Sequence, residues 1–277
     1  MPVTDQNDGS APQTHATYEY LRVGRVPTDR LQELSDVYFD SEAPDYDHFD
    51  VQVERRSKYL RAVNDYVAGK LRESPTCRLI ISFGCGTGRR EGEIVAMTPH
   101  RPRVVGIERV PRMAAIAQSR GLVVVPSVGH LAEVGASSAD YVLALYSFVH
   151  LPDVKARKQV LRSLAHALRP GGLLILDVFN LHDRFEWASK VADGGRGSMP
   201  PTTGRHRGDT LYRRIGHDEV SFMHYFTVAE ISALVEEAGL VVVELLGVGH
   251  GKNPGELGVP LDAGCILVAA MKPSVSQ

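Results

Sequence analysis

Short apolar runs alternate with helical patterns along most of this chain. After Pro75, five runs have the form of strands that are buried on both faces: Leu79–Ser82, Arg103–Ile107, Leu122–Val125, Asp140–Leu145 and Leu173–Val178. Two further strands are predicted at Leu240–Leu246 and Cys265–Met271. Helical spacing lies between them at Arg90–Met97, Pro111–Arg120, Val154–Leu168 and Val228–Ala238. Strand alternating with helix implies parallel pairing and right-handed crossovers. The pattern therefore predicts a doubly wound α/β sheet.

The segments outside this alternation divide the chain. Residues 1–17 are polar and predict a disordered leader. Residues 18–74 carry helical periodicity at 30–37 and 53–71, which predicts an N-terminal helical cap. The main domain then covers 75–272, followed by a tail at 273–277. Within it, residues 181–226 show little periodicity, and we interpret this insertion as a lid or substrate-binding segment, because long irregular loops are usually functional.

Composition excludes several classes of protein. The chain has 277 residues, 43% of them hydrophobic and 23% charged, as in ordinary globular proteins. Its net charge of −2 provides no general attraction to nucleic acid or to anionic membranes. The three cysteines, Cys77, Cys85 and Cys265, are widely spaced and fit reduced thiols. No apolar run has transmembrane length, and we expect a cytoplasmic protein.

A glycine-rich turn is the strongest local signal. Gly84, Gly86 and Gly88 follow the first strand of the main domain and precede a helix. Glycine allows a sharp turn and close approach to a ligand, and the helix that follows directs free N–H groups at it. Glu108 ends the next strand, about twenty residues on, where a carboxylate can accept both hydrogen bonds of a ribose diol. The Gly-x-Gly-x-Gly order differs from the dinucleotide pattern, so a nucleoside ligand other than NAD is favoured.

Four segments together resemble the class I S-adenosylmethionine-dependent methyltransferases. They are residues 83–88, 104–113, 139–153 and 168–177, supported by the aromatic–Asp pairs Tyr38-Phe-Asp40 and Tyr46-Asp47. The resemblance covers roughly residues 35–272. It implies S-adenosylmethionine as cofactor and a Rossmann-like, seven-stranded sheet whose last strand is antiparallel. It also implies N-terminal helices and a substrate-capping insertion before the last two strands.

The same resemblance assigns cofactor-binding residues. They are Tyr46, Ser82, Gly84, Cys85, Gly86, Gly88, Glu108, Arg109, Met113, Ser127, Val128 and Tyr146. Two positions depart from the family, because Ser82 and Ser127 stand where acidic residues are usual. A serine forms hydrogen bonds without carrying charge, and losing a charge-assisted contact costs on the order of 1.5–3 kcal/mol. We therefore expect weaker cofactor binding or a bridging water there.

Methyl transfer from a sulfonium is an in-line displacement, so aligning the reactants is the main task. A hydroxyl or amine acceptor also has a proton to lose, which a general base assists. His150, with an ordinary imidazole pKa, is the first candidate base, although a bond to the backbone is an equal alternative. Tyr146 and His224 are further catalytic candidates. No metal site is predicted, because His182, His206, His217 and His224 follow no ligand spacing.

The insertion supplies candidate acceptor contacts. Its apolar and aromatic residues are Phe185, Trp187, Met199, Tyr212, Phe222 and Met223. Its arginines are Arg196, Arg205, Arg207, Arg213 and Arg214. These arginines form either a solvated loop or a site for an anionic acceptor, since arginine pairs well with carboxylate and phosphate.

The leading hypothesis is a methyltransferase acting on an O or N atom of a small molecule in biosynthetic or secondary metabolism, as a monomer or homodimer. A tRNA-modifying enzyme is the first alternative, because residues 208–214 and 223–227 faintly resemble wobble-uridine methyltransferases. The near-neutral charge argues against it, since RNA binding needs clustered Lys and Arg. The second alternative is a non-catalytic binding protein with the cofactor fold, suggested by Ser82 and Ser127.

Overall fold

A large mixed sheet forms the centre of the molecule. The computed structural model describes residues 18–21, 26–135, 138–183, 208–250 and 253–274. The sheet has eight strands in the order β10-β9-β11-β6-β5-β2-β3-β4. Their bounds are β2 Leu79–Phe83, β3 Arg103–Ile107, β4 Val123–Val125, β5 Ala139–Ala144, β6 Leu168–Val178, β9 Val241–Val248, β10 Leu257–Val259 and β11 Cys265–Met271.

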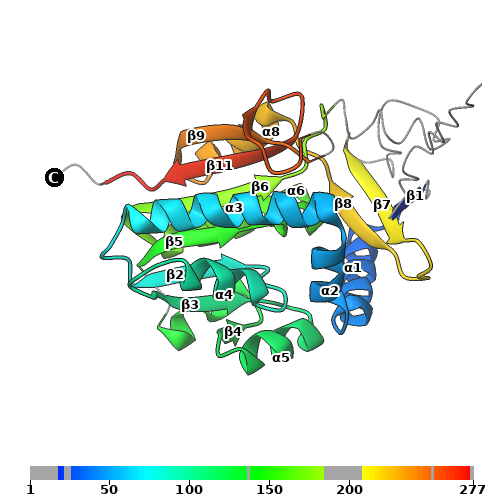
Figure 1. Ribbon diagram of the computed structural model, residues 1–277, viewed down its shortest axis with the longest axis horizontal. Helices are drawn as coiled ribbons and strands as arrows, with labels where there is room; N and C mark the ends of the chain where they lie inside the picture. The colour runs from blue at the N-terminus through cyan, green and yellow to red at the C-terminus, as the bar shows by residue number, and fades with distance from the viewer. Residues whose placement is uncertain (1–17, 22–25, 136–137, 184–207, 251–252, 275–277) are drawn as a thin grey trace, which may run out of the picture.

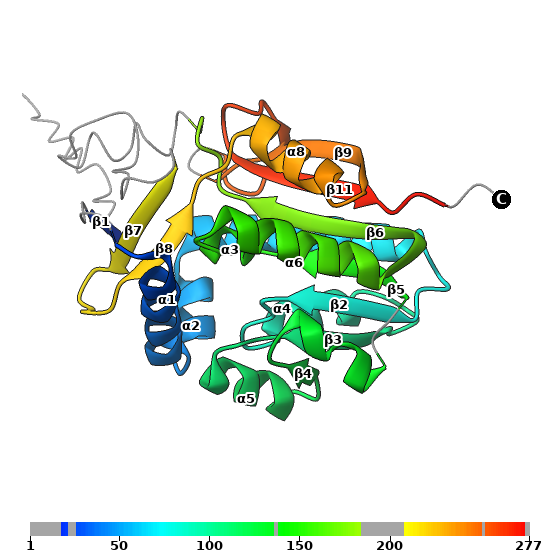
Figure 2. The ribbon, with the colours of Figure 1, turned by 180° about the vertical axis from the view of Figure 1, so that it is seen from behind.

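Helices cover both faces of this sheet. The α3 and α4 helices lie on one face (Figure 1), and α6 and α8 lie on the other (Figure 2). The helices are α1 Thr28–Glu42, α2 Tyr46–Gln52, α3 Glu54–Arg72, α4 Arg89–Ala96, α5 Pro111–Ser119, α6 Val154–Ala167 and α8 Val228–Glu237. Because both faces are covered, the central strand β5 is buried along its whole length.

The strand pairing confirms the predicted doubly wound fold. Strands β2 to β6 pair in parallel, whereas β11 is antiparallel to both β6 and β9. The eighth strand was not predicted: β10 pairs with Gly247 and Val248 at the end of β9. With three residues and Gly258 at its centre, β10 has too short a pattern to be recognised.

A second sheet corrects two predictions. Part of the insertion forms strands instead of an irregular loop, and the N-terminal cap contains a strand besides its helices. Strand β7 (Asp209–Arg214) pairs antiparallel with β1 (Tyr18–Leu21) on one side and with β8 (Ser221–His224) on the other. It adjoins α1, since the Phe222 N–H donates to Ser35 Oγ over 3.0 Å. These strands are short, and β1 pairs with a strand far along the chain, so local periodicity does not reveal them.

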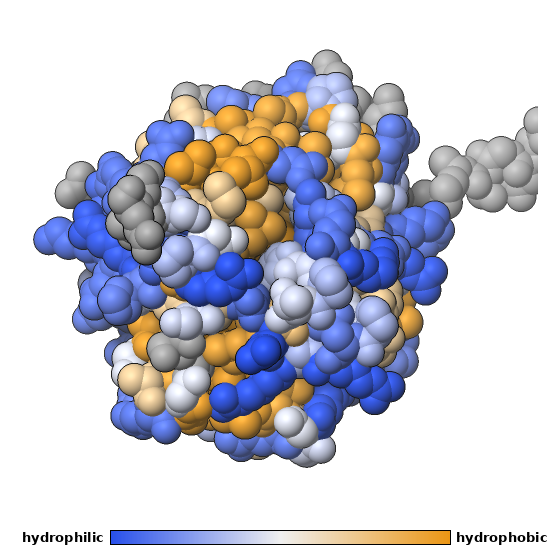
Figure 3. All heavy atoms as spheres, turned by 90° about the vertical axis from the view of Figure 1, so that its left-hand side faces the viewer, coloured by the Kyte–Doolittle hydropathy of each residue, from blue (hydrophilic) through white to orange (hydrophobic). Residues whose placement is uncertain are grey.

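The end of the molecule where β9 begins and β11 finishes carries a hydrophobic surface patch among charged residues (Figure 3). Val241 and Val243 of β9 are each about half exposed, and Met271 of β11 is also exposed. Among the described residues, no helix is both long and apolar enough to span a bilayer. The leader and residues 184–207, with the insertion residues predicted there, lie outside the described part of the chain.

Candidate active site

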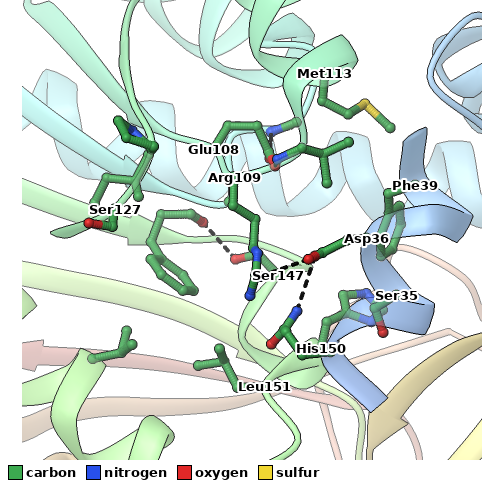
Figure 4. A pocket seen from close by; sticks show the side chains of 18 of the residues that line it. Ser35, Asp36, Phe39, Glu108, Arg109, Met113, Ser127, Ser147, His150 and Leu151 are labelled. Atoms are coloured by element: carbon green, nitrogen blue, oxygen red, sulfur yellow. Dashed lines mark hydrogen bonds and ion pairs between the residues drawn. The ribbon is translucent and has the colours of Figure 1, made fainter. Parts of the chain in front are cut away.

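A cavity of about 410 Å³ opens at the carboxyl ends of β2, β3 and β5. This is the edge at which parallel α/β sheets bind ligands, because the crossovers leave a crevice there. The lining residues used below come from α1, the start of α2, α5, the glycine turn and the connections after β3, β4 and β5 (Figure 4): Gln32, Asp36, Phe39, Tyr46, Gly84, Gly86, Glu108, Arg109, Met113, Ser127, Val128, Tyr146, Ser147 and His150.

The three glycine positions of the turn differ in what a side chain would contact there. All have positive φ, between 56° and 73°. A Cβ on Gly84 would lie 2.5 Å from the Cβ of Ser147, and one on Gly88 would lie 3.2 Å from the Cβ of Ala117. At Gly86 nothing lies within 4 Å of that position. Packing therefore excludes a Cβ at Gly84 and leaves little room for one at Gly88, whereas Gly86 leaves bare backbone beside the cavity.

Glu108 joins the glycine turn to the connection after β3. Its carboxylate accepts hydrogen bonds from the Gly86 N–H at 2.9 Å and from the Val110 N–H at 2.8 Å. Burial raises the pKa of this carboxyl, and the backbone N–H groups partly oppose that change. Glu108, which the sequence singled out, therefore lines the cavity with its carboxylate held by backbone N–H groups.

An ion pair crosses the cavity from the main domain to the helical cap. Arg109 Nη2 lies 2.7 Å from Asp36 Oδ2 of α1, and Gln32 donates to the same carboxylate over 3.3 Å (Figure 4). Burial raises the pKa of Asp36, whereas Arg109 acts in the opposite direction. Sequence reasoning did not identify Gln32 or Asp36, and it named Phe39 only within the Tyr38-Phe-Asp40 motif, because no local pattern tells which face of a helix covers a site.

The segment after β5 forms another wall of the cavity. Tyr146 has φ +59°, and its N–H donates to Asp177 Oδ1 over 2.5 Å. Ser147 Oγ donates to the Phe83 carbonyl over 2.7 Å. His150 Nδ1 lies 2.8 Å from the Phe222 carbonyl and must donate to it, which leaves Nε2 as the acceptor.

The expectation of an ordinary pKa for His150 is wrong. Burial of the ring, aided by the positive charge of Arg56, lowers the pKa of His150 to about 4. The imidazole is therefore neutral at pH 7 and a much weaker proton acceptor than expected.

Four other predicted residues do not line this cavity. Ser82 is buried and donates to Glu91 Oε1 over 2.6 Å. The Cys85 sulfur lies 2.4 Å from where a Cβ on Gly106 would be, and burial raises the pKa of this thiol. Gly88 packs against α5, as described above. His224 is buried, with Nδ1 at 2.6 Å from Asp209 and Nε2 at 3.0 Å from Glu230, so its position does not support a catalytic role at this cavity.

The described insertion residues also differ from expectation. Tyr212, Phe222 and Met223 are buried in the second sheet and do not line this cavity. Arg214 Nη1 lies 2.8 Å from Glu42 Oε2, so its charge is already paired. In the described part of the chain, no group of three or more His, Cys, Asp or Glu residues is arranged to hold a metal ion.

Comparisons of the sequence with known proteins find a matching family model and curated relatives. The family model described as "Methyltransferase domain" matches residues 51–245. The curated relatives include C-methyltransferase NovU of Streptomyces niveus, 27% identical over 60% of this chain and 34% of the relative. The ubiquinone biosynthesis O-methyltransferase of Xanthomonas axonopodis pv. citri is 26% identical over 55% of this chain and 60% of the relative. The chain thus spans about a third of the length of the first relative and about three fifths of the length of the second.

Solved structures show the same fold. The 1,6-didemethyltoxoflavin-N1-methyltransferase of Burkholderia thailandensis, solved with S-adenosylhomocysteine, has a TM-score of 0.57 at 18% identity, covering 93% of this chain and 95% of that one. The magnesium protoporphyrin IX methyltransferase of Synechocystis PCC 6803 has a TM-score of 0.58 at 16% identity, covering 86% and 97%. The chain therefore belongs to the methyltransferase-domain family, and its fold is that of the class I S-adenosylmethionine-dependent methyltransferases.

Proposed function

We propose that this protein binds S-adenosylmethionine in the cavity and transfers its methyl group to a small molecule. The observation that carries the proposal is the joining of Gly86 and Glu108 at the cavity wall, at the carboxyl ends of adjacent parallel strands. A bare backbone beside a buried carboxylate suits a ribose diol, because the carboxylate can accept both hydroxyl hydrogens.

The remaining lining residues support a consistent arrangement of the cofactor. Met113 and Val128 offer apolar surface for a purine, and Ser127 offers a hydroxyl beside it. Tyr46 and Tyr146 line the part of the cavity formed by α2 and the end of β5. In this proposal the methionine part lies along Gly84 towards Tyr146, and the methyl group faces the acceptor there.

Catalysis in this proposal depends mainly on alignment. The sulfonium is already an activated leaving group, and holding the reactants in line can supply roughly 7–11 kcal/mol of the barrier. His150 suits a hydrogen-bond acceptor that orients an acceptor hydroxyl or amine, because its lowered pKa makes it a poor base at neutral pH.

Oxygen or nitrogen remains the acceptor atom that we propose, in biosynthetic metabolism. Carbon is a second candidate, because one of the matched relatives is a C-methyltransferase. An anionic acceptor has less support than the arginine count suggests, since Arg214 is paired with Glu42.

Calorimetry with S-adenosylmethionine and S-adenosylhomocysteine tests the proposal. We expect the wild-type protein to bind both, and Glu108→Ala to bind each at least about tenfold more weakly, because hydrogen bonds to a charged group contribute about 1.5–3 kcal/mol. Glu133→Ala is the matched control, since this glutamate is exposed and does not line the cavity.

Absence of wild-type binding to both ligands at near-millimolar concentration would refute the proposal. If binding is found, a screen of candidate acceptors with methyl-labelled cofactor then identifies the acceptor class and the atom that is methylated.

A further inference from the structure

A buried carboxylate lies directly behind the proposed reaction site. Asp177, near the end of β6, is 1% exposed and accepts two hydrogen bonds. Tyr59 of α3 donates its hydroxyl to Oδ2 over 2.5 Å, and the Tyr146 N–H donates to Oδ1 over the same distance. Neither Asp177 nor Tyr59 lines the cavity, yet both are linked to a residue that does.

Tyr146 needs such support because its backbone conformation is unfavourable. A φ of +59° lies in the left-handed region, which bulky non-glycine residues rarely adopt. Strained residues of this kind persist only where the surroundings determine them. At Tyr146 the bond to Asp177 fixes the backbone where β5 leaves the sheet.

The Tyr146 ring is held separately from its backbone. The Arg56 guanidinium lies 4.8 Å from the ring centroid, and the Phe179 and Tyr59 rings lie at 5.0 and 5.9 Å. Arg56 is itself paired with Asp50, with 2.5 Å between Nε and Oδ1. Tyr59 therefore contacts both the carboxylate that fixes the backbone and the ring of the same residue.

The turn at Tyr146 also directs the next segment. Ser147 follows at once and fills the space beside Gly84, where a Cβ would lie 2.5 Å away. The 3₁₀ turn η3 (Phe148–His150) comes next and carries His150 to the cavity. A change in the Tyr146 backbone would consequently displace the cavity wall and the contact with the glycine turn.

We propose that Asp177 and Tyr59 are positioning residues, which hold Tyr146 in its left-handed conformation so that the cofactor cavity is preformed. The inference rests on the proposed function of that cavity. Tyr59 acts as a hydrogen-bond donor throughout, because burial and the neighbouring Asp177 raise its pKa well above the ordinary value. Its phenol keeps its proton and fixes the orientation of the carboxylate.

The test is S-adenosylhomocysteine affinity, measured by calorimetry on natively folded variants. Asp177→Asn keeps the side-chain shape but loses the charge. We expect about tenfold weaker binding or more, because a charge-assisted bond is lost and the binding-competent conformation becomes less populated. Thermal unfolding is recorded in parallel, so that lower affinity of a native protein is separated from loss of folded protein.

Tyr59→Phe removes only the hydroxyl and remains testable if Asp177→Asn does not fold. Its matched control is Tyr66→Phe on the same helix, where the hydroxyl also donates to a carboxylate, Glu244, over 2.7 Å. We expect weaker binding for Tyr59→Phe and wild-type affinity for Tyr66→Phe.

A double-mutant cycle isolates the backbone effect. Glycine adopts a positive φ without strain, so in a Tyr146→Gly background Asp177→Asn is expected to reduce affinity much less than in the wild type. Equal losses in both backgrounds, or wild-type affinity for Asp177→Asn, would overturn the inference. Failure of the wild type to bind S-adenosylhomocysteine would instead contradict the proposed function.

Discussion

Burial changes the acid–base chemistry of His150, a residue that the sequence singled out and that lines the cavity. Its ring packs at 4.9 Å from Phe39, and Nδ1 is committed to a carbonyl of β8. A histidine after a strand suggests a base only if water can stabilise its charged form. Here burial disfavours the charged imidazole, so His150 stays neutral and serves as a hydrogen-bond acceptor through Nε2.

The stability of the folded protein at acid pH should reflect the lowered pKa of His150. The pKa of His150 is about 4 in the folded protein and about 6.5 when unfolded, so the unfolded chain takes up the proton first as pH falls. Stability is therefore full above about pH 6.5 and is lost towards pH 4, by up to about 3 kcal/mol from this residue. His150→Asn, whose amide nitrogen stands at the position of Nδ1 and can also donate to the Phe222 carbonyl, should lose that part of the pH dependence.

Urea unfolding of both proteins at pH 7 and pH 4.5 makes the measurement. The same pH-dependent loss of stability in the variant and the wild type would show that His150 is not the cause.

Residues of the site differ in how far the sequence could reveal them. Gly86 and Glu108 belong to local patterns with a fixed spacing, so they could be identified. Asp177 and Tyr59 could not be paired, because they are 118 positions apart and meet only after the sheet and α3 have packed. Asp36 likewise becomes part of the site only through the docking of α1.

Among the elements, the seven-residue helix α2 depends on the main domain for its position. Asp47 accepts a hydrogen bond from Thr87 Oγ1 over 2.6 Å and pairs with Arg120 Nη2 at 2.5 Å. Asp50 of the same helix pairs with Arg89 at 3.0 Å. These contacts fasten α2, and with it Tyr46, to the glycine turn.

Loss of the Asp47 contacts should therefore free the helix more than it destabilises the fold. For Asp47→Ala we expect a stability loss of about 1 kcal/mol or less, as for other partly exposed ion pairs. The dissociation rate of S-adenosylhomocysteine should rise several-fold, because Tyr46 lines the cavity. Stopped-flow displacement measures the rate, with the exposed Asp45→Ala as control. An unchanged rate would mean that α2 does not retain the cofactor.

The predicted strands and helices were those whose signal is local. Strands buried on both faces, such as β5, show as apolar runs, and amphipathic helices such as α6 show their period. Strand β1 is stabilised by pairing with β7, far along the chain, and the β7–β8 hairpin packs against α1. No window of sequence contains that information.

At the scale of the molecule, one buried cluster connects the second sheet to the helices on the main sheet. Arg157 of α6 is fully buried and lies 3.7 Å from Asp209 of β7 and 3.6 Å from Glu230 of α8. Its Nε donates to the Leu151 carbonyl over 2.8 Å, beside the cavity-lining segment. His224 completes the cluster between the two carboxylates.

Removing the arginine would leave two carboxylates with one basic partner. Breaking a buried pair typically costs about 3–5 kcal/mol, and we expect Arg157→Met to lower the free energy of unfolding by that amount in urea titrations. Arg162→Met, at an exposed position of the same helix, should change it by less than about 0.5 kcal/mol. A small effect of Arg157→Met would show that the cluster does not stabilise the junction.

The packing of Cys85 against Gly106 has a consequence for how this protein can evolve. The sulfur occupies the space in which any side chain at position 106 would begin. The two positions consequently share one volume, and a larger residue at 106 is accessible only after residue 85 becomes smaller. Because position 85 lies within the glycine turn, the order in which such substitutions arise is constrained by the need to keep the turn intact at every step.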